Sequence, residues 1–319
     1  MKRLNHLLAA ASVCLTLSGC GGGGNEATSH SADVSRGTAA TWEYQDADMY
    51  AKVTFNADPT DFGADLLRDE LANPDPSSKA FYQMIRDMGG FDAFHKLLAE
   101  QDEAKLSATL RLYGISMNNP ESTRRELSVE PATESETSGV AKPLAITDCV
   151  KFFPIGDRNK AFALPSQFVY IDAQGRPAYA AWHGGPSTTP VAGTRLPCGT
   201  TVGTWGVATD IGGHMIPAAL GGYGGRANVI PQDRTLNGSA WRSVEYVPTL
   251  CRKKFPVQYQ FTNSYFSPAD VRPAFIQAWV KIDHAFASTV GSTGTRNGPP
   301  TAEAVTQLNA FKTMATYYC

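Results

Sequence analysis

Apolar residues recur at helical spacing in the first third of the chain. They lie three or four positions apart at Phe81, Met84, Ile85 and Met88, and again at Phe94, Leu97, Leu98, Leu106 and Leu110. Such spacing gathers apolar side chains on one face of a helix, and Gly89-Gly90 ends the first run. We therefore predict one helix up to residue 89 and a second from 91 to 112. His95 is expected at the surface of the second helix or at its boundary.

Beyond residue 149 the pattern becomes that of strands. Residues 168–171 and 178–182 are rich in aromatic and apolar side chains and flank Gln174-Gly175, which predicts a hairpin. A further strand is expected over 201–208, and helices are expected over 236–244 and 273–287. Strands mixed with a few helices, without regular alternation of the two, predict an α+β fold.

The first twenty residues have the pattern of an export signal. Lys2 and Arg3 precede a short apolar run that is too short to span a bilayer, which takes about 20 residues. Leu17-Ser18-Gly19-Cys20 then resembles a bacterial lipobox, in which Cys20 is lipidated. The alternative is an ordinary secretory signal with a chance cysteine. We expect an exported protein that its lipid anchors in the cell envelope, at the outer membrane or the cell surface.

Composition divides the remainder of the chain. We predict a signal peptide over 1–19, a Gly- and Ser-rich tether over 20–40, a small, mostly helical region over 41–114, a linker over 115–142 and a further domain over 143–319. The first 142 residues carry a net charge of −8, whereas the last 177 carry +6. A basic domain suits a polyanionic partner such as nucleic acid.

Four cysteines remain after the signal and the lipidation site are set aside. They are Cys149, Cys198, Cys251 and Cys319, all within the last domain. An even number of cysteines in an exported protein predicts two disulfides, for which three pairings are open.

Candidate chemistry is concentrated between residues 210 and 245. A histidine, His214, follows two glycines, where its ring could stand exposed at a turn. Asn237 stands at the start of a predicted helix, where it could also serve as the cap, and Glu245 lies eight residues further along it. On a regular helix, positions four and eight apart share one side. An amide oxygen and a carboxylate near a histidine suit a hard cation that keeps most of its waters.

The same stretch resembles the active-site segment of the DNA/RNA non-specific endonucleases. These belong to the ββα-metal (His-Me finger) superfamily, and the branch of type VII secretion nuclease toxins and DNA-entry nucleases is the most similar. The resemblance rests on five short elements in order, namely Gly213-His214-Met-Ile-Pro217, Asn228-Val-Ile-Pro231-Gln232, Leu236-Asn237, Trp241 and Glu245. It implies a ββα-metal finger with an antiparallel sheet and flanking helices.

The resemblance also implies residue roles. His214 would be the general base and Asn237 the protein ligand of one Mg²⁺ (or Mn²⁺), while Glu245 would hold a water of that ion. Asn228 and Gln232 would fix the surrounding loop. Arg226 and Arg242 are weaker candidates for phosphate contacts. The implied substrate is DNA, with RNA as the further candidate.

One departure from the family pattern affects the interpretation. Many members have Asp-Arg-Gly-His, whereas Ile211-Gly212-Gly213 precedes His214 here, and Asp210 is one place too early unless a bulge restores it. Two alternatives therefore stay open. The first is an inactive, nucleic-acid-binding lipoprotein on a nuclease scaffold, and the second is a nuclease toxin with an immunity protein as partner.

Overall fold

The computed structural model describes residues 40–43, 51–56, 76–118, 149–164, 166–189, 198–284, 288–317 and 319. Cys20 and most of the predicted linker lie outside these residues. Every element that follows belongs to one compact unit, Val34–Cys319. No helix in the described ranges has both the length and the apolar character needed to cross a membrane.

In the described part of the chain, nine strands form one sheet in the order β1-β2-β11-β10-β9-β6-β5-β4-β3. All neighbours are antiparallel except β3 and β4. The strands are β1 (Ala40–Glu43), β2 (Ala51–Asn56), β3 (Ser116–Met117), β4 (Lys160–Leu164), β5 (Gln167–Ile171), β6 (Pro177–Gly184), β9 (Val257–Ser264), β10 (Phe275–Asp283) and β11 (Ser288–Arg296). The β5–β6 pair is the predicted hairpin.

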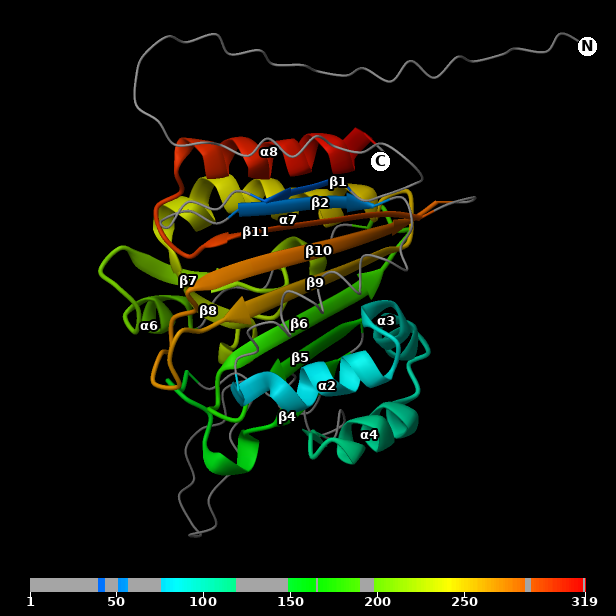
Figure 1. Cartoon of the computed structure of the whole chain (residues 1–319), viewed down its shortest axis with the longest axis vertical. Coiled ribbons are helices and arrows are strands. Elements are labelled where there is room, and N and C mark those ends of the chain that lie inside the picture. Colours follow the sequence, from blue (N-terminus) through cyan, green and yellow to red (C-terminus); the bar gives the residue numbers. More distant parts are fainter. Residues whose placement is uncertain are drawn as a thin grey trace, which may run out of the picture. The chain divides into compact units, whose positions relative to one another are not determined.

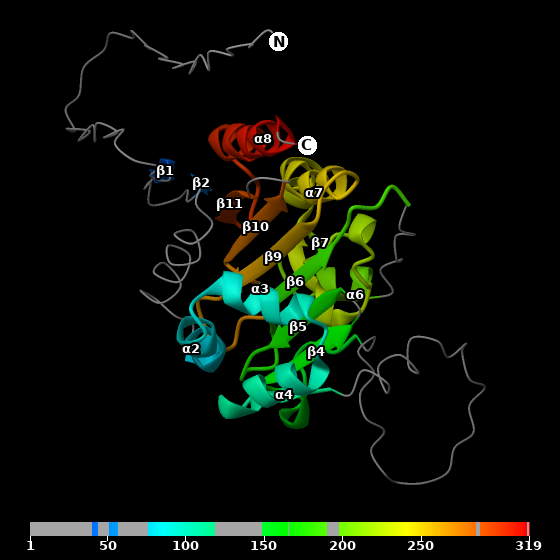
Figure 2. The same cartoon turned by 90° about the vertical axis from the view of Figure 1, so that its right-hand side faces the viewer.

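Helices cover both faces of the sheet (Figure 1 and Figure 2). One face carries α2 (Lys79–Asp87), α3 (Phe91–Ala99) and α4 (Glu103–Leu112), whose predicted apolar residues pack against β5 and β6. The other face carries α7 (Trp241–Cys251) over β9 and β10, and α8 (Ala302–Tyr317) over β11 and β2. Short helical turns complete the described elements, namely η1 (Pro76–Ser78), η2 (Ile155–Asp157), η3 (Ala218–Leu220) and η4 (Arg226–Asn228). The expected α+β class is confirmed.

Three expectations about individual elements are corrected. Residues 275–283 form β10 and not a helix, because their apolar positions alternate between the two faces, as Ile276 and Val280 show against Trp279. The expected strand over 201–208 is replaced by the short helix α6 (Gly199–Gly203). The helix expected over 91–112 is broken between Ala99 and Glu103, where Gln101 has φ of 53°.

His95 is buried and does not lie at the surface. Its ring stacks on Trp279 with 4.8 Å between the centroids, and its Nε2 lies 3.2 Å from Oε1 of Gln260. Burial lowers the pKa of His95 to about 3. The apolar neighbours of His95 in the sequence gave no sign of this, because its partners come from β9 and β10.

Candidate active site

The candidate site is built on a hairpin followed by a helix. Strands β7 (Asp210–His214) and β8 (Val229–Asp233) pair antiparallel, and the chain then enters η5 (Leu236–Ala240), a π-helical turn that continues into α7. This is the ββα order that the resemblance implies. The register runs from Asp210 opposite Asp233 to His214 opposite Val229 without a shift. No bulge therefore moves Asp210 closer to His214.

Asp233 caps the turn into the helix. Its Oδ1 accepts hydrogen bonds from the main-chain nitrogens of Thr235 (2.9 Å) and Leu236 (3.0 Å). Asn237 is therefore not needed as the cap. Its half-exposed side chain makes no hydrogen bond within the described residues. The π-helical turn breaks the regular helical phase between Asn237 and α7. Trp241 is fully buried, whereas Asn237 and Glu245 are half-buried.

The loop after His214 is fixed by two buried side chains. Asn228 accepts a hydrogen bond from the nitrogen of Ile216 (2.8 Å) and donates to the carbonyls of Ile216 (3.1 Å) and Tyr223 (2.9 Å). Tyr259 of β9 donates its hydroxyl to the carbonyl of Met215 (3.1 Å). These bonds orient the backbone on the C-terminal side of the histidine.

Gln232 lies fully buried beside the histidine strand. A Cβ added at Gly213 would run into its Oε1, so the amide lies directly over that glycine. Neither amide atom of Gln232 has a hydrogen-bond partner in the described structure. The role that the resemblance implies for Gln232, support of the loop, rests here on packing alone.

His214 is half-buried, and its Nε2 is buried without a hydrogen-bond partner among the described residues. Burial lowers its pKa to about 4, because the charged imidazolium loses hydration there. The ring is therefore neutral at physiological pH and can accept a proton.

Glu245 is a half-buried carboxylate on α7. Desolvation raises its pKa to about 7, while the charge of Arg242 acts in the opposite direction. Its carboxylate makes no ion pair or hydrogen bond with the described residues. Its charge contributes to the raised pKa of Tyr259, after the larger effect of burial. Glu245 is thus electrostatically coupled to the tyrosine that holds the residue after His214.

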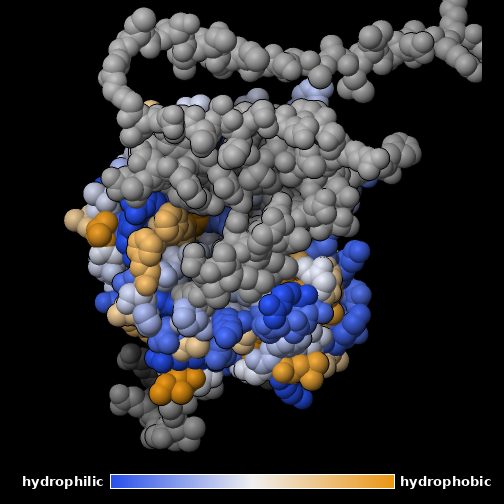
Figure 3. Space-filling view, viewed as in Figure 1, coloured by the Kyte–Doolittle hydropathy of each residue, from blue (hydrophilic) through white to orange (hydrophobic). Residues whose placement is uncertain are grey.

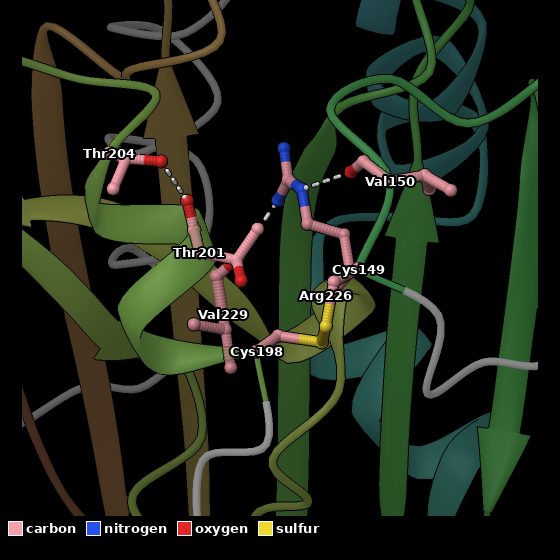
Figure 4. The surroundings of a disulfide bond; sticks show 7 residues. All are labelled: Cys149, Val150, Cys198, Thr201, Thr204, Arg226 and Val229. Atoms are coloured by element: carbon pink, nitrogen blue, oxygen red, sulfur yellow. Dashed lines mark hydrogen bonds between the residues drawn. A yellow bond between two sulfur atoms is a disulfide. The ribbon is translucent and has the colours of Figure 1, made fainter.

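Arg226 does not stand where a phosphate could reach it. Its buried guanidinium donates to the carbonyls of Val150 (3.1 Å), Val229 (2.8 Å) and Lys151 (3.3 Å), as Figure 4 shows for the first two. We correct the expectation of a phosphate contact for this residue, because all of its contacts are internal. Arg242, in contrast, is exposed on α7.

The predicted disulfides are Cys149–Cys198 and Cys251–Cys319. The first one joins Cys149, the neighbour of Val150, to Cys198, the residue just before α6 (Figure 4). The second ties the last residue of α7 to the last residue of the chain. Four cysteines therefore fix both the helix of the site and the segment beside its hairpin.

The structure shows why Gly212 differs from the pattern of the family that this segment resembles. A Cβ at Gly212, where many members have arginine, would lie 2.6 Å from both Cα and the carbonyl oxygen of Gly199 in α6. Asp210, buried at the start of β7, is instead paired with Arg272 through bonds of 2.6 and 3.0 Å. The backbone of α6 therefore occupies the place where a longer side chain at position 212 would begin.

Sequence reasoning missed Tyr259, Asp233 and Arg272. The aspartate had a readable signal, since a carboxylate just before a helix commonly caps it. The other two did not, because their partners lie 44 and 62 residues away in the sequence.

Comparisons with known proteins give only weak likenesses. No protein-family model matches the chain, and no curated protein matches it. Among solved structures, NucA from Streptococcus agalactiae with a magnesium ion bound has a TM-score of 0.32 and 21% identity, covering 39% of this chain and 68% of that one. NucA without metal has a TM-score of 0.31 and 20% identity, with 47% and 74% covered. Values this low do not assign the chain to a family.

Proposed function

We propose that this chain is a metal-dependent endonuclease that hydrolyses phosphodiester bonds of DNA, with RNA as the further candidate substrate. One observation carries the proposal. The end of β7 and the helix that follows the hairpin present three polar groups that have no partner in the described structure, namely Nε2 of His214, the amide of Asn237 and the carboxylate of Glu245. A buried polar atom without a partner requires an explanation, which applies here to Nε2 of His214, whereas the half-exposed Asn237 and Glu245 are open to a ligand.

His214 acts as the general base in this proposal. A base must be deprotonated before it takes a proton from water, and burial keeps the pKa of His214 near 4. Asn228 and Tyr259 hold the backbone beside it through Ile216 and Met215. These bonds fix the backbone that follows His214, while Nε2 of its ring stays available to accept a proton.

The residues also fit a hard divalent cation. No group of three His, Cys, Asp or Glu side chains gathers within the described ranges. An amide oxygen from Asn237, with Glu245 to orient water around the ion, suits Mg²⁺ or Mn²⁺, because Mg²⁺ keeps several of its waters. Such an ion would neutralise charge on the phosphate and on the leaving 3′-oxygen, which implies products with 5′-phosphates.

Glu245 must be ionised to orient water toward a cation. Its raised pKa of about 7 reflects the free protein, and a cation close by would favour the charged form. Arg242, one turn earlier on the exposed side of α7, remains the candidate for a phosphate contact. The net charge of +6 over residues 143–319 favours any polyanionic substrate.

We place the enzyme outside the cytoplasm, anchored through lipid on Cys20. Two disulfides support an oxidising compartment, and the lipobox resemblance supports the anchor. A Cys20→Ser chain should lose both the mass of the lipid and its membrane fraction. Retention of membrane partitioning without a mass difference would remove the anchor from the proposal.

The nuclease is tested with the full-length oxidised chain on supercoiled plasmid and on a structured RNA. The variants are His214→Ala and Asn237→Ala, matched by His183→Ala and Asn309→Ala, which lie on β6 and α8. Cutting that needs Mg²⁺, stops with EDTA and is lost only in the first pair would support the proposal. A folded native chain that cuts neither substrate with any divalent ion would overturn it.

A second function is favoured by the position of α6. Because its backbone excludes a side chain at position 212, a contact used by many relatives cannot form. If the native chain binds DNA in the presence of EDTA and never cuts it, the protein is a nucleic-acid-binding lipoprotein on a nuclease scaffold.

A further inference from the structure

Two adjoining hollows lie along the histidine hairpin. The first has a volume of about 570 Å³, and residues from several loops line it, among them Lys151, Trp205, Val207, Phe266, Arg272 and Arg296. The second, of about 620 Å³, lies between α6 and β7 and is lined by Thr200, Thr204, Ile211, Gly212 and Arg234 among others. Gly206 and Val207 line both hollows, so they form one groove, which we call the β7 groove.

The β7 groove lies beside the strand that ends at the proposed base, although His214 itself lines neither hollow. Asp210, Gly212 and His214 alternate along β7 and so share one face of the hairpin. Asp210 and Gly212 line the second hollow, and Arg272, the partner of Asp210, lines the first. At about 3.3 Å per residue, the Asp210–Arg272 pair lies roughly 13 Å from His214 along the strand. A ligand bound beside this pair would therefore have to extend about 13 Å to reach His214.

Exposed aromatic and basic side chains meet in the groove. Phe266 is 71% exposed, and Val207 is 53% exposed. Lys151 and Arg234 are exposed and make no ion pair with the described residues. Figure 3 shows apolar residues beside strongly hydrophilic ones at the left-hand edge, the side where Figure 1 places α6. The ring of Phe266 packs edge to face on Phe275 of β10, with 5.6 Å between the centroids, and most of its surface stays open to solvent.

Phe266 is held outward by a buried ion pair. Arg176, fully buried against Asp172, donates to the carbonyls of Ser267 (2.7 Å) and Asp270 (3.3 Å). Its guanidinium also stacks 4.0 Å from the ring of Tyr265. Both neighbours of Phe266 are thus fixed, so the exposed ring is positioned before any ligand arrives, which lowers the cost of ordering it on binding.

We propose that the β7 groove binds a single-stranded segment of the nucleic acid whose phosphodiester reaches His214. Unpaired bases stack on exposed aromatic rings, while basic side chains track the phosphates. A paired duplex offers the same phosphates but keeps its bases stacked on each other, so Phe266 distinguishes the two forms. The inference rests on the proposed function, because it gives the substrate preference of the same site.

Binding is measured first, with the full-length chain carrying His214→Ala in Mg²⁺ so that the strand stays intact. The probes are a labelled twelve-nucleotide oligo-dT and a hairpin duplex of equal charge. Phe266→Ala should weaken oligo-dT binding about fivefold or more and duplex binding about twofold or less. Leu112→Ala, which removes another exposed apolar side chain on α4, should change neither.

The salt dependence of binding tests the basic side chains of the groove. Arg234→Gln should lower the slope of log affinity for oligo-dT against log salt concentration by about 0.7, the value for one phosphate contact.

Cleavage by the otherwise native chain then separates the two proposals. Phe266→Ala should raise KM for single-stranded DNA and leave kcat unchanged, because the ring contacts bases away from the scissile bond. If the native chain cuts DNA and Phe266→Ala binds and cuts both forms as the native chain does, the groove proposal is wrong and the nuclease stands. Equal weakening for both probes would also overturn it. If the native chain cuts nothing while oligo-dT binding still depends on Phe266, the nuclease proposal fails and the groove is upheld.

Discussion

The hydroxyl of Tyr259 donates a hydrogen bond to the carbonyl of Met215, with 3.1 Å between the two oxygens. Tyr259 belongs to β9 near the middle of the sheet, and Met215 follows the proposed general base. The charge of Glu245 on α7 also acts on this tyrosine. Through Tyr259, β9 therefore connects the His214 part of the candidate site, on β7, with the Glu245 part, on α7.

Tyr259→Phe should impair both stability and activity. The Met215 carbonyl would be left unpaired in a buried position, which costs about 1–3 kcal/mol of unfolding free energy. Freedom in the loop would also displace His214, and small displacements of catalytic groups cost up to about 100-fold in rate. We expect plasmid cutting to fall by at least about tenfold. Urea unfolding and initial cleavage rates measure the two effects.

Tyr170→Phe is the matched control. Its hydroxyl donates to Oδ1 of Asn159 (3.0 Å), and the ring packs on the face covered by α2–α4. This variant should lose stability and keep its cleavage rate. If both tyrosine variants lose activity in proportion to stability, Tyr259 has no particular connection to the site.

The pH dependence of cleavage should follow Glu245 more than His214. Both groups act in their deprotonated forms, so activity should rise with pH through each pKa. The pKa of His214 is about 4 and that of Glu245 about 7, so the upper of the two sets the rise. Higher Mg²⁺ should move this rise to lower pH, because the cation favours the carboxylate.

Glu245→Gln provides the test. The variant should cut more slowly, and its rate should no longer change near pH 7 but only nearer to pH 4. Rates at saturating substrate over pH 4–9, at two Mg²⁺ concentrations, measure this. An unchanged rise near pH 7 in the glutamine variant would assign it to another group.

His95 should make the fold sensitive to acid. Its pKa is about 3 in the folded chain and 6.5 when exposed, so the unfolded state binds more protons between these values. Folding stability from this residue is complete above pH 6.5 and is lost as the pH falls toward 3. Between pH 7 and pH 5 the loss should be about 2 kcal/mol.

Replacement of His95 by glutamine separates this contribution from the carboxylates. Glutamine can still bond Gln260 but cannot be protonated. Urea unfolding at pH 7 and pH 5 should show about 2 kcal/mol less difference for this variant than for the native chain. An identical difference would mean that His95 is not buried in its neutral form.

Structural features set by residues close together in the sequence could be predicted, whereas features set by residues far apart in the sequence could not. The helical region over 79–112 and the β5–β6 hairpin follow from local periodicity, and both are found, although a break at Gln101 divides the second predicted helix. Residues 275–283 were assigned the wrong period, although Ile276, Ala278, Val280 and Ile282 alternate as a half-buried strand should. Pro273 before this segment, and the polar residues mixed among the apolar ones within it, made the alternation hard to recognise.

For the candidate site, the order of the motifs predicted the hairpin–helix arrangement but not the hydrogen bonds that stabilise it. Asn228 was predicted as a loop residue, and it binds the loop through three hydrogen bonds. Arg226 could not be assigned correctly, because its partners Val150 and Lys151 lie about 75 residues earlier. Charge alone does not tell whether an arginine meets a phosphate or a main-chain carbonyl. Only the three-dimensional structure distinguishes these two kinds of contact.

Gly212→Ala should destabilise the fold through α6. The added Cβ would lie 2.6 Å from backbone atoms of Gly199, which cannot rotate away as a side chain would. Overpacking of this kind costs about 1–3 kcal/mol. Gly156→Ala is the control, because a Cβ there meets nothing within 4 Å and that glycine has no positive φ. Thermal unfolding of both variants gives the comparison.

The disulfide determines whether α6 can yield to the new methyl group. Cys149–Cys198 holds Cys198, the residue just before α6, so its removal should allow the helix to move away from β7. In a Cys149→Ser, Cys198→Ser background, Gly212→Ala should therefore cost less than it does in the oxidised chain. A double-mutant cycle measures this coupling, which reaches about 0.5–3 kcal/mol between residues in contact. Strict additivity would show that the hairpin itself, and not α6, absorbs the clash, and our account of why position 212 lacks an arginine would then be wrong.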